Sequence, residues 1–353
     1  MNVMKQVKHL NTVIFLIAAI ALLSACSTAR RGQSGSSNPF AKGADVSWLP
    51  QMEASGFKFY NANGTEEDCL KILKDHGMNS VRLRTFVNPS NDKRSGHCSK
   101  EETVAMAVRA QKMGMRVMID FHYSDSWADP GKQKKPAAWE GHDFPQLLND
   151  VYSHTADVMT ALKTSGVTPE WVQVGNETPG GMIYPEGRTS NWAQLAQIIN
   201  KGHDAIKAVS PKSKVVLHVD QGNNRPRFRS WFDSATAHHA RYDVIGLSYY
   251  PYWLNGNPVY TLSIDDLGQN LNDLAARYGK EVMVVEVGGE DIKPDNTYDM
   301  LVAVQKKVRE VPNGKGLGVL YWEPEGAKSW SGYGLSAWGS DGKPTKALSA
   351  FLK

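Results

Sequence analysis

Eight strand-like runs alternate with helical stretches along the chain, and this alternation restricts the fold more than any other feature. The runs are dense in Val, Ile, Leu and Met instead of alternating apolar with polar residues. That composition is typical of strands that are covered on both faces. The runs cover residues 42–48, 80–86, 116–122, 170–176, 214–220, 243–249, 281–286 and 317–322.

Amphipathic stretches between these runs predict helices over residues 65–76, 99–113, 144–165, 192–209, 264–278 and 297–311, and more weakly over 228–239. Thr65 and Ser99 each have an acidic residue three positions later, which is a helix-capping signal. The units repeat without a break in composition and predict one (β/α)8 TIM barrel over residues 40–353. A doubly wound open sheet is the alternative. It would more often carry a Gly-rich phosphate loop after its first strand, where this chain has ADVSWLP.

Polar residues gather where the predicted strands end. In a parallel barrel, these ends share one mouth, so their side chains converge there. Each residue taken alone could be an ion-pair partner, a helix cap or a hydrogen-bonded core group. Buried polar groups cost free energy unless they are paired or functional, and their convergence on one face indicates a site. The set comprises Asp45, Arg82, Arg84, Asp120, His122, Asn176, Glu177, His218, Asp220, Tyr249, Tyr250, Glu286, Trp322 and Glu323.

Two glutamates in this set suggest a chemistry. Glu177 follows the fourth strand and Glu286 ends the seventh, so the two carboxyl groups would lie nearly opposite each other in an eight-stranded ring. Glycoside hydrolysis needs such a pair, one carboxyl protonated and the other ionised. Unequal surroundings and mutual repulsion would separate their pKa values. Many Trp and Tyr residues in the expected rim loops suit a sugar polymer, because CH groups on sugar faces stack on aromatic rings.

Short strings along the chain resemble glycoside hydrolase family 53, the endo-β-1,4-galactanases of clan A. They occur in the family's order from about residue 40 to the C-terminus: GADVS at 43–47, RTFVNP at 84–89, DFHYSDSWADP at 120–130, GNE at 175–177, SYYP at 248–251 and YWEP at 321–324. The resemblance implies a retaining endo-β-1,4-galactanase that hydrolyses galactan side chains of pectin by double displacement.

The resemblance also implies roles for individual residues. Glu177 would be the general acid/base and Glu286 the nucleophile, with their carboxyl groups about 5–5.5 Å apart. Asn176 would bind the sugar 2-hydroxyl, and Trp322 would form the floor beneath the cleaved sugar. Arg84 and Tyr249 would hold Glu286 ionised and oriented. The remaining expected substrate contacts are Asp45, His122, Asp125, Trp127, His218 and Asp220.

The chain departs from the family pattern in two places. Residues 287–290 read VGGE, where the family usually has a Thr and then an aromatic-Pro pair. We therefore expect altered surroundings for Glu286 and one altered cleft wall. Some bacterial members carry calcium in a long loop after the eighth strand. Here residues 328–343 contain one acid, Asp341, too few oxygen ligands for calcium, so we expect no metal and no cofactor.

Three rival hypotheses remain open. The same mechanism could act on another β-linked glycan, such as mannan or glucan, because the loop after the seventh strand differs. A surface lipoprotein could bind glycan without cleaving it, although both glutamates are present. A metalloenzyme is the most distant alternative, since His122 and His218 lack the close spacing of a dedicated ligand set. A net charge of +4 over 353 residues, without a basic stripe, gives no support to nucleic-acid binding, and we expect a monomer.

The N-terminus resembles a lipoprotein leader. Lys5 and Lys8 precede an apolar run at residues 10–23, and LSAC at 23–26 resembles a bacterial lipobox. An ordinary signal peptide is the alternative. The sequence predicts a signal peptide over residues 1–25, lipidation of Cys26, a flexible tether over 26–39, and an exported, membrane-anchored protein in the periplasm or at the cell surface.

Two further cysteines, Cys69 and Cys98, would reach an oxidising compartment if the chain is exported. A disulfide between them is then possible. They could equally remain apart as small apolar side chains. The sequence leaves both alternatives open.

Overall fold

The computed structural model describes residues 39–92, 97–254 and 259–353. The predicted signal peptide, the lipidation site Cys26 and the tether up to residue 38 lie outside the described residues. Phe40–Lys353 form one compact unit. Within the described ranges, no helix has the length and apolar character needed to cross a membrane.

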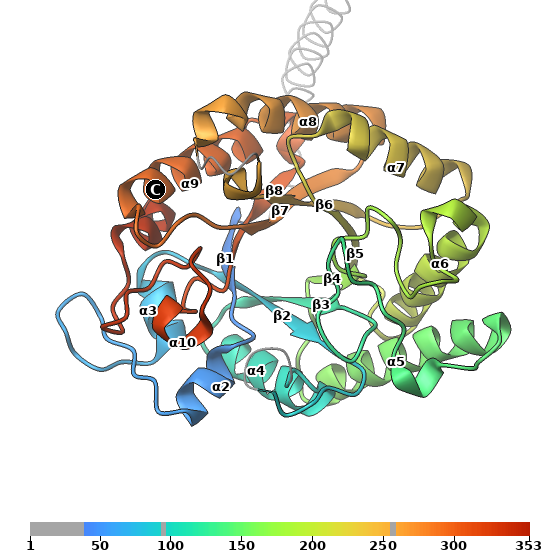
Figure 1. Cartoon of the computed structure of the whole chain (residues 1–353), viewed down its shortest axis with the longest axis horizontal. Helices are drawn as coiled ribbons and strands as arrows, with labels where there is room; N and C mark the ends of the chain where they lie inside the picture. Colours follow the sequence, from blue (N-terminus) through green and yellow to red (C-terminus); the bar gives the residue numbers. More distant parts are fainter. Residues whose placement is uncertain (1–38, 93–96, 255–258) are drawn as a thin grey trace, which may run out of the picture. The chain divides into compact units, whose positions relative to one another are not determined.

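Eight parallel strands close into a barrel in the order of the sequence, and β1 pairs with both β2 and β8. Figure 1 shows this ring of strands with helices around it. Each expected run overlaps one strand, so the predicted (β/α)8 barrel is confirmed. The strands are β1 (Ala41–Asp45), β2 (Ser80–Thr85), β3 (Arg116–Phe121), β4 (Trp171–Val174), β5 (Lys214–Val219), β6 (Val244–Tyr249), β7 (Glu281–Val287) and β8 (Gly316–Trp322).

Helices separate successive strands. The longer ones are α3 (Cys69–Asp75), α4 (Lys100–Lys112), α5 (Phe144–Thr164), α6 (Trp192–Val209), α7 (Arg225–Ala237), α8 (Ile264–Arg277) and α9 (Pro294–Arg309). Two short α-helices, α2 (Leu49–Ala54) and α10 (Lys328–Ser331), lie in the loops after β1 and β8. Single turns of 3-10 helix are η1 (Ala137–Trp139), η2 (Thr189–Asn191), η3 (Pro251–Trp253), η4 (Tyr260–Leu262) and η5 (Pro312–Gly314), and η6 (Lys346–Leu352) ends the chain.

The two capping signals had different outcomes. Ser99 forms the expected capping box with Glu102 at the start of α4. The prediction at Thr65 was wrong, because α3 begins four residues later and Asp68 accepts the backbone N–H of Lys71 at 3.1 Å. Asp68 takes the N-cap position because its short carboxylate reaches the third backbone N–H of the helix.

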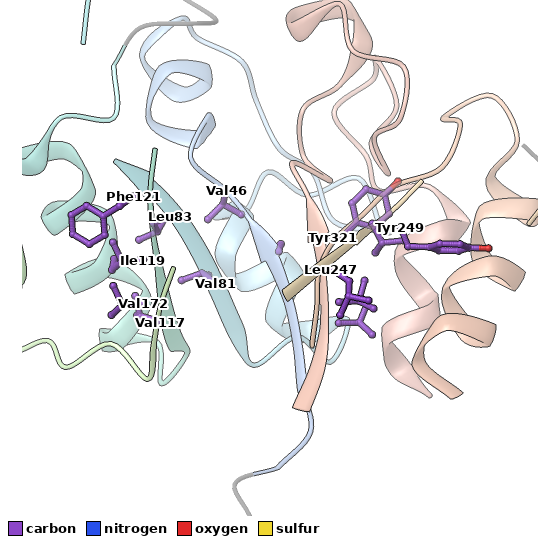
Figure 2. Packing of buried hydrophobic residues seen from close by; sticks show 14 of the residues in the cluster. Val46, Val81, Leu83, Val117, Ile119, Phe121, Val172, Leu247, Tyr249 and Tyr321 are labelled. Atoms are coloured by element: carbon purple, nitrogen blue, oxygen red, sulfur yellow. The ribbon is translucent and has the colours of Figure 1, made fainter. Parts of the chain in front are cut away.

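Side chains on the strands divide between two apolar layers. Outward-facing residues pack against the helices, and Figure 2 shows several of them, including Val81, Leu83 and Leu247. A smaller cluster fills the barrel interior: Ala41, Met118, Trp171, Val216, Val244, Met283, Val285 and Leu320. Beyond this plug, towards the C-terminal ends of the strands, the inward positions become polar. The interior is therefore a packed floor beneath a polar mouth.

Cys69 and Cys98 are both buried and unbonded. Cys69 lies in the outer apolar core at the start of α3. The Cys98 thiol lies 3.8 Å from the carbonyl oxygen of Ser47. Of the two alternatives left open by the sequence, the structure has separate apolar thiols, and it contains no disulfide between them.

Candidate active site

A cavity of about 480 Å³ opens among the strand ends and the loops that follow them. Both glutamates line it, as do residues at or just after the ends of β5, β6 and β8, so the predicted convergence is confirmed for these members of the set. The lining residues are His122, Trp127, Ala128, Asp129, Pro130, Lys132, Asn176, Glu177, Asp220, Gln221, Asn223, Ser248, Tyr250, Trp253, Leu254, Glu286, Trp322 and Tyr333.

Glu286 is held through both carboxylate oxygens. Arg82 Nη1 lies 2.9 Å from Oε1, and the hydroxyl of Tyr250 donates to Oε2 at 3.1 Å. Glu286 is 6% exposed, so water competes little for these bonds. A carboxylate fixed by a cation and a hydroxyl keeps one orientation towards the cavity.

Arg82 joins three carboxylates beneath the cavity. Besides Glu286, its guanidinium contacts Asp45 at 3.0 Å and Asp120 at 2.8 Å. The second terminal nitrogen also donates to Asn176 Oδ1 at 2.8 Å. Arg82 is fully buried, and burying a guanidinium costs much free energy unless partners of this kind are present. Arg82 therefore links the strand that carries Asn176 to the strand that carries Glu286.

Glu177 reaches the cavity through an unusual backbone turn. Its φ is +42°, in the left-handed region, and Gly175 before it has φ +81°. A Cβ at Gly175 would lie 2.8 Å from Met182 and 2.9 Å from Thr178, so this position requires glycine. The Gln133 side-chain amide holds the turn by donating to the carbonyls of Asn176 and Glu177 at 2.8 and 3.1 Å. Backbone strain held by neighbours is common at functional sites.

The two glutamates have different electrostatic surroundings. Burial raises the pKa of both carboxyls, and the charge of Glu286 raises the pKa of Glu177 further. Arg82 and the Tyr250 hydroxyl oppose this rise at Glu286. Among the described residues, no cation forms an ion pair with Glu177, whose carboxylate accepts a 2.5 Å bond from Ser248. As pH rises, Glu286 therefore ionises first and Glu177 keeps its proton longer.

The predictions that Arg84 and Tyr249 contact Glu286 were wrong. Arg84 pairs with Glu323 instead, and its guanidinium lies 4.1 Å from the Trp127 ring centroid. Tyr249 points out of the barrel into the helix layer, where Figure 2 shows it, and its hydroxyl bonds to Ser263 at 2.9 Å. Successive residues on a strand face opposite sides, so the neighbouring Tyr250 reaches the nucleophile.

Several residues that were expected to contact the sugar form hydrogen bonds with other parts of the protein instead. Asp45 is buried and bonds Ser47 and Arg82. The Asp125 carboxylate accepts the backbone N–H groups of Asn88 and Ala137, which fixes a loop. Both residues, and also His218, are absent from the cavity lining. The prediction of direct sugar contact is corrected for these three, because backbone and side-chain partners occupy their polar atoms.

Other predicted residues do face the cavity. His122 lines it, although Nδ1 accepts the Ala128 N–H at 2.9 Å and Nε2 lies 3.0 Å from Asp120. A sugar would therefore meet the imidazole ring and not a free ring nitrogen. Asn176 also faces the cavity, and its amide nitrogen donates to the carbonyl of Ala128 at 2.8 Å. Asp220 is held by a bidentate pair with Arg227, whose Nε and Nη2 each donate to one carboxylate oxygen at 2.9 Å.

Aromatic rings form one side of the cavity. Trp322 lies 5.1 Å from Trp48 and 4.8 Å from Tyr333 between ring centroids, and Trp127 lies 5.7 Å from Trp322. Trp253 contributes from the loop after β6 and is 64% exposed. Edge-on contacts of this kind fix the rings relative to one another. The result is an apolar wall next to the paired carboxyls.

Four contributors were not assigned a role from the sequence. Ser248 lies on the inward face of β6, and Tyr250, the residue just after the strand, continues that face, so period-two alternation could have revealed both. Arg82 could also have been predicted, because strand alternation places it at an inward position near acidic residues of the neighbouring strands. Tyr333 comes from the irregular segment after α10, where no local pattern indicates direction.

The two family departures lie away from the cavity lining. Residues 287–290 do not line the cavity, and Gly288 lies against the ring of Tyr250, which does. Gly289 instead packs on Thr297, and the Tyr321 hydroxyl contacts its backbone at 3.3 Å. In the loop after β8, Asp341 accepts the backbone N–H of Lys343. A single carboxylate that already bonds to the backbone does not fit a calcium site. Within the described ranges, no group of three side chains could hold a metal ion.

Comparison with known proteins agrees with this geometry. The family model for glycosyl hydrolase family 53 matches residues 41–351. A probable arabinogalactan endo-β-1,4-galactanase A from Neosartorya fischeri is 35% identical over 305 residues, covering 80% of this chain and 83% of its own. An endo-β-1,4-galactanase from Bacillus subtilis is 35% identical over 315 residues, covering 82% of this chain and 71% of its own.

Solved structures give the same result. A structure described as one of two fungal β-1,4-galactanases superposes with a TM-score of 0.80 at 30% identity, covering 89% of this chain and 99% of that chain. The catalytic domain of an Ignisphaera aggregans family 53 enzyme gives a TM-score of 0.81 at 28% identity, covering 88% and 95% of the two chains. Because the family model spans nearly the whole barrel, this chain belongs to glycosyl hydrolase family 53.

Proposed function

We propose that the protein is a retaining endo-β-1,4-galactanase that cleaves the galactan side chains of pectin. The asymmetric surroundings of the two carboxyls carry this proposal: Arg82 and Tyr250 hold Glu286, whereas Glu177 has a hydroxyl donor and forms no ion pair with a cation in the described part of the chain. The galactanase names of relatives that match most of the barrel support the substrate. The aromatic wall supports a sugar polymer as the ligand.

In the first step, Glu177 acts as the general acid. Its proton passes to the glycosidic oxygen while an oxygen of Glu286 attacks the anomeric carbon from the opposite side. The bond between that carbon and the leaving oxygen breaks, and an ester bond to Glu286 forms. Arg82 and Tyr250 keep the attacking carboxylate ionised and directed into the cavity.

In the second step, Glu177 acts as the general base. Now ionised, it accepts a proton from a water molecule whose oxygen attacks the same anomeric carbon. The ester bond to Glu286 breaks, and the sugar leaves with its original stereochemistry. Both carboxyls return to their starting protonation states, so the cycle balances without a cofactor.

Incubation of the pure protein with linear β-1,4-galactan tests the activity. We expect internal cleavage, which appears as an early spread of oligomers of many lengths. Parallel incubations with β-linked mannan and glucan serve as controls, and we expect little product from either. Cleavage of one of those glycans but not of galactan would contradict the substrate assignment and leave the mechanism intact.

Export with a lipid anchor is proposed from residues 1–38 alone. The basic start, the apolar run and LSAC at 23–26 support lipidation of Cys26. We expect the protein in the membrane fraction of the cell that makes it, and the Cys26→Ala variant outside that fraction. Detection of an unmodified mature N-terminus by mass spectrometry would contradict lipidation.

A further inference from the structure

A chain of hydrogen bonds ends at the acid/base glutamate. The hydroxyl of Ser248 donates to Oε1 of Glu177 at 2.5 Å, and His218 Nε2 lies 2.7 Å from the same hydroxyl oxygen. Ser248 is 1% exposed and His218 is fully buried. Water therefore does not compete for these bonds, which strengthens them. The double-displacement mechanism itself requires neither Ser248 nor His218.

The neighbours of His218 decide which ring nitrogen carries its proton. Burial lowers the pKa of His218 well below its usual value, so the imidazole is neutral and carries one proton. Its Nδ1 faces two donors, the amide nitrogen of Gln173 at 3.1 Å and the backbone N–H of Glu177 at 3.4 Å. Asn176 Oδ1 also lies 3.1 Å from Nδ1, but it accepts a shorter, charge-assisted bond from Arg82 at 2.8 Å. Nδ1 is therefore the acceptor, and the proton lies on Nε2.

We propose that Ser248 and His218 are positioning residues that orient the catalytic proton of Glu177. The imidazole N–H donates to the Ser248 oxygen, so the single hydroxyl proton points at Oε1 of Glu177. With Oε1 occupied as an acceptor, the proton of the acid form sits on Oε2. This inference rests on the proposed function, because it takes Glu177 as the acid/base.

The same chain serves the second catalytic step. Once Glu177 has given its proton to the leaving oxygen, the Ser248 bond stabilises the resulting carboxylate until water supplies the next proton. No proton passes along the chain itself. The hydroxyl and imidazole protons stay on Ser248 and His218 through both steps, and only the Oε2 proton of Glu177 is exchanged with substrate and water.

Other groups act on Glu177 in both directions. The charges of Glu286 and Asp220 disfavour its ionisation, and the charge of Arg82 favours it. The phenols of Tyr250 and Tyr333 also interact electrostatically with Glu177. Ser248 supplies the side-chain hydrogen bond that lowers the pKa of Glu177. Loss of that donor removes a stabilising bond from the ionised form, so the pKa must rise.

The Ser248→Ala variant tests the proposal through the pKa of Glu177. We would measure that pKa by 13C NMR titration of labelled glutamate carboxyls, assigned with Glu177→Gln, and compare it with the basic limb of kcat/KM. Both should move up by about 1–2 pH units. Ser248→Thr keeps the hydroxyl and should restore the wild-type values. His218→Leu should shift both in the same direction by a smaller amount.

Ser263→Ala is the matched control. It deletes a buried serine hydroxyl that bonds to Tyr249 on the outer side of β6, and it should leave the titration unchanged. An unshifted Glu177 pKa in folded Ser248→Ala, or an equal shift in Ser263→Ala, would overturn the proposal. If Ser248→Ala does not fold, His218→Leu decides by the same titration. The NMR readout needs no substrate, so it stands even if galactan proves to be the wrong glycan.

Discussion

Replacement of Glu286 by Gln should reduce kcat on galactan by at least about 10⁴-fold, because the amide cannot form the ester intermediate. The fold should survive, since Arg82 keeps its pairs with Asp45 and Asp120. A galactoside with a good leaving group should not rescue this variant, because the missing group is the nucleophile. Steady-state rates on both substrates, with circular dichroism as the folding control, check this result.

Glu177→Gln should show a different pattern. Loss of a general acid should lower kcat on galactan by about 10²–10⁴-fold. With a good leaving group, the first step needs little acid, so the glycosyl-enzyme ester should accumulate and appear in intact-protein mass spectra. In the wild type, activity should fall at high pH as Glu177 loses its proton. The fall in activity at high pH should be absent with the galactoside that has a good leaving group, because its first step needs no general acid. Equal losses for both variants on both substrates would contradict the assigned roles.

The parts predicted correctly depend on patterns that are local in the sequence. A strand covered on both faces needs a continuous apolar run, and eight such runs in βα units leave few closed topologies. Glu177 and Glu286 were found because both immediately end such runs. Sequence order around the ring was then enough to bring the two residues to the same cavity.

The parts predicted wrongly depend on side-chain direction and on strand stagger. Tyr249 and Tyr250 are adjacent aromatics, and the inward face of β6 decides between them. A shift in register between Leu247 and Ser248 sets which β7 residue stands beside each inward position, and Ser248 comes to pair with Glu286. Such a shift is a property of two strands together and leaves no mark in either sequence alone.

The choice between Arg82 and Arg84 has the same origin. Both point into the barrel and both are buried, so neither composition nor periodicity separates them. Barrel strands are staggered relative to one another, so the deeper arginine meets Glu286 and the one nearer the mouth meets Glu323. Long-range register therefore decides which cation serves the nucleophile.

Arg82→Met should be the most destabilising single change near the cavity. It removes the cation that three carboxylates share, and breaking a buried pair in this way costs about 3–5 kcal/mol. The loss should be greatest at high pH. Burial already raises the pKa of Glu286, and loss of the cation that opposes this rise moves it further up, so stability falls as pH rises from the unfolded towards the native pKa of Glu286. Denaturant unfolding at several pH values measures this trend.

Arg84→Met is the matched comparison, because Arg84 is equally buried on the same strand but pairs with Glu323. Both variants should lose stability. At a temperature well below unfolding, only Arg82→Met should also lose most of its kcat, because Glu286 without its cation would hold a proton at neutral pH. Arg84→Met should act mainly on KM, through the Trp127 ring beside its guanidinium. A larger fall in kcat for Arg84→Met than for Arg82→Met would show that the cation nearer the mouth, and not the deeper one, keeps the nucleophile ionised.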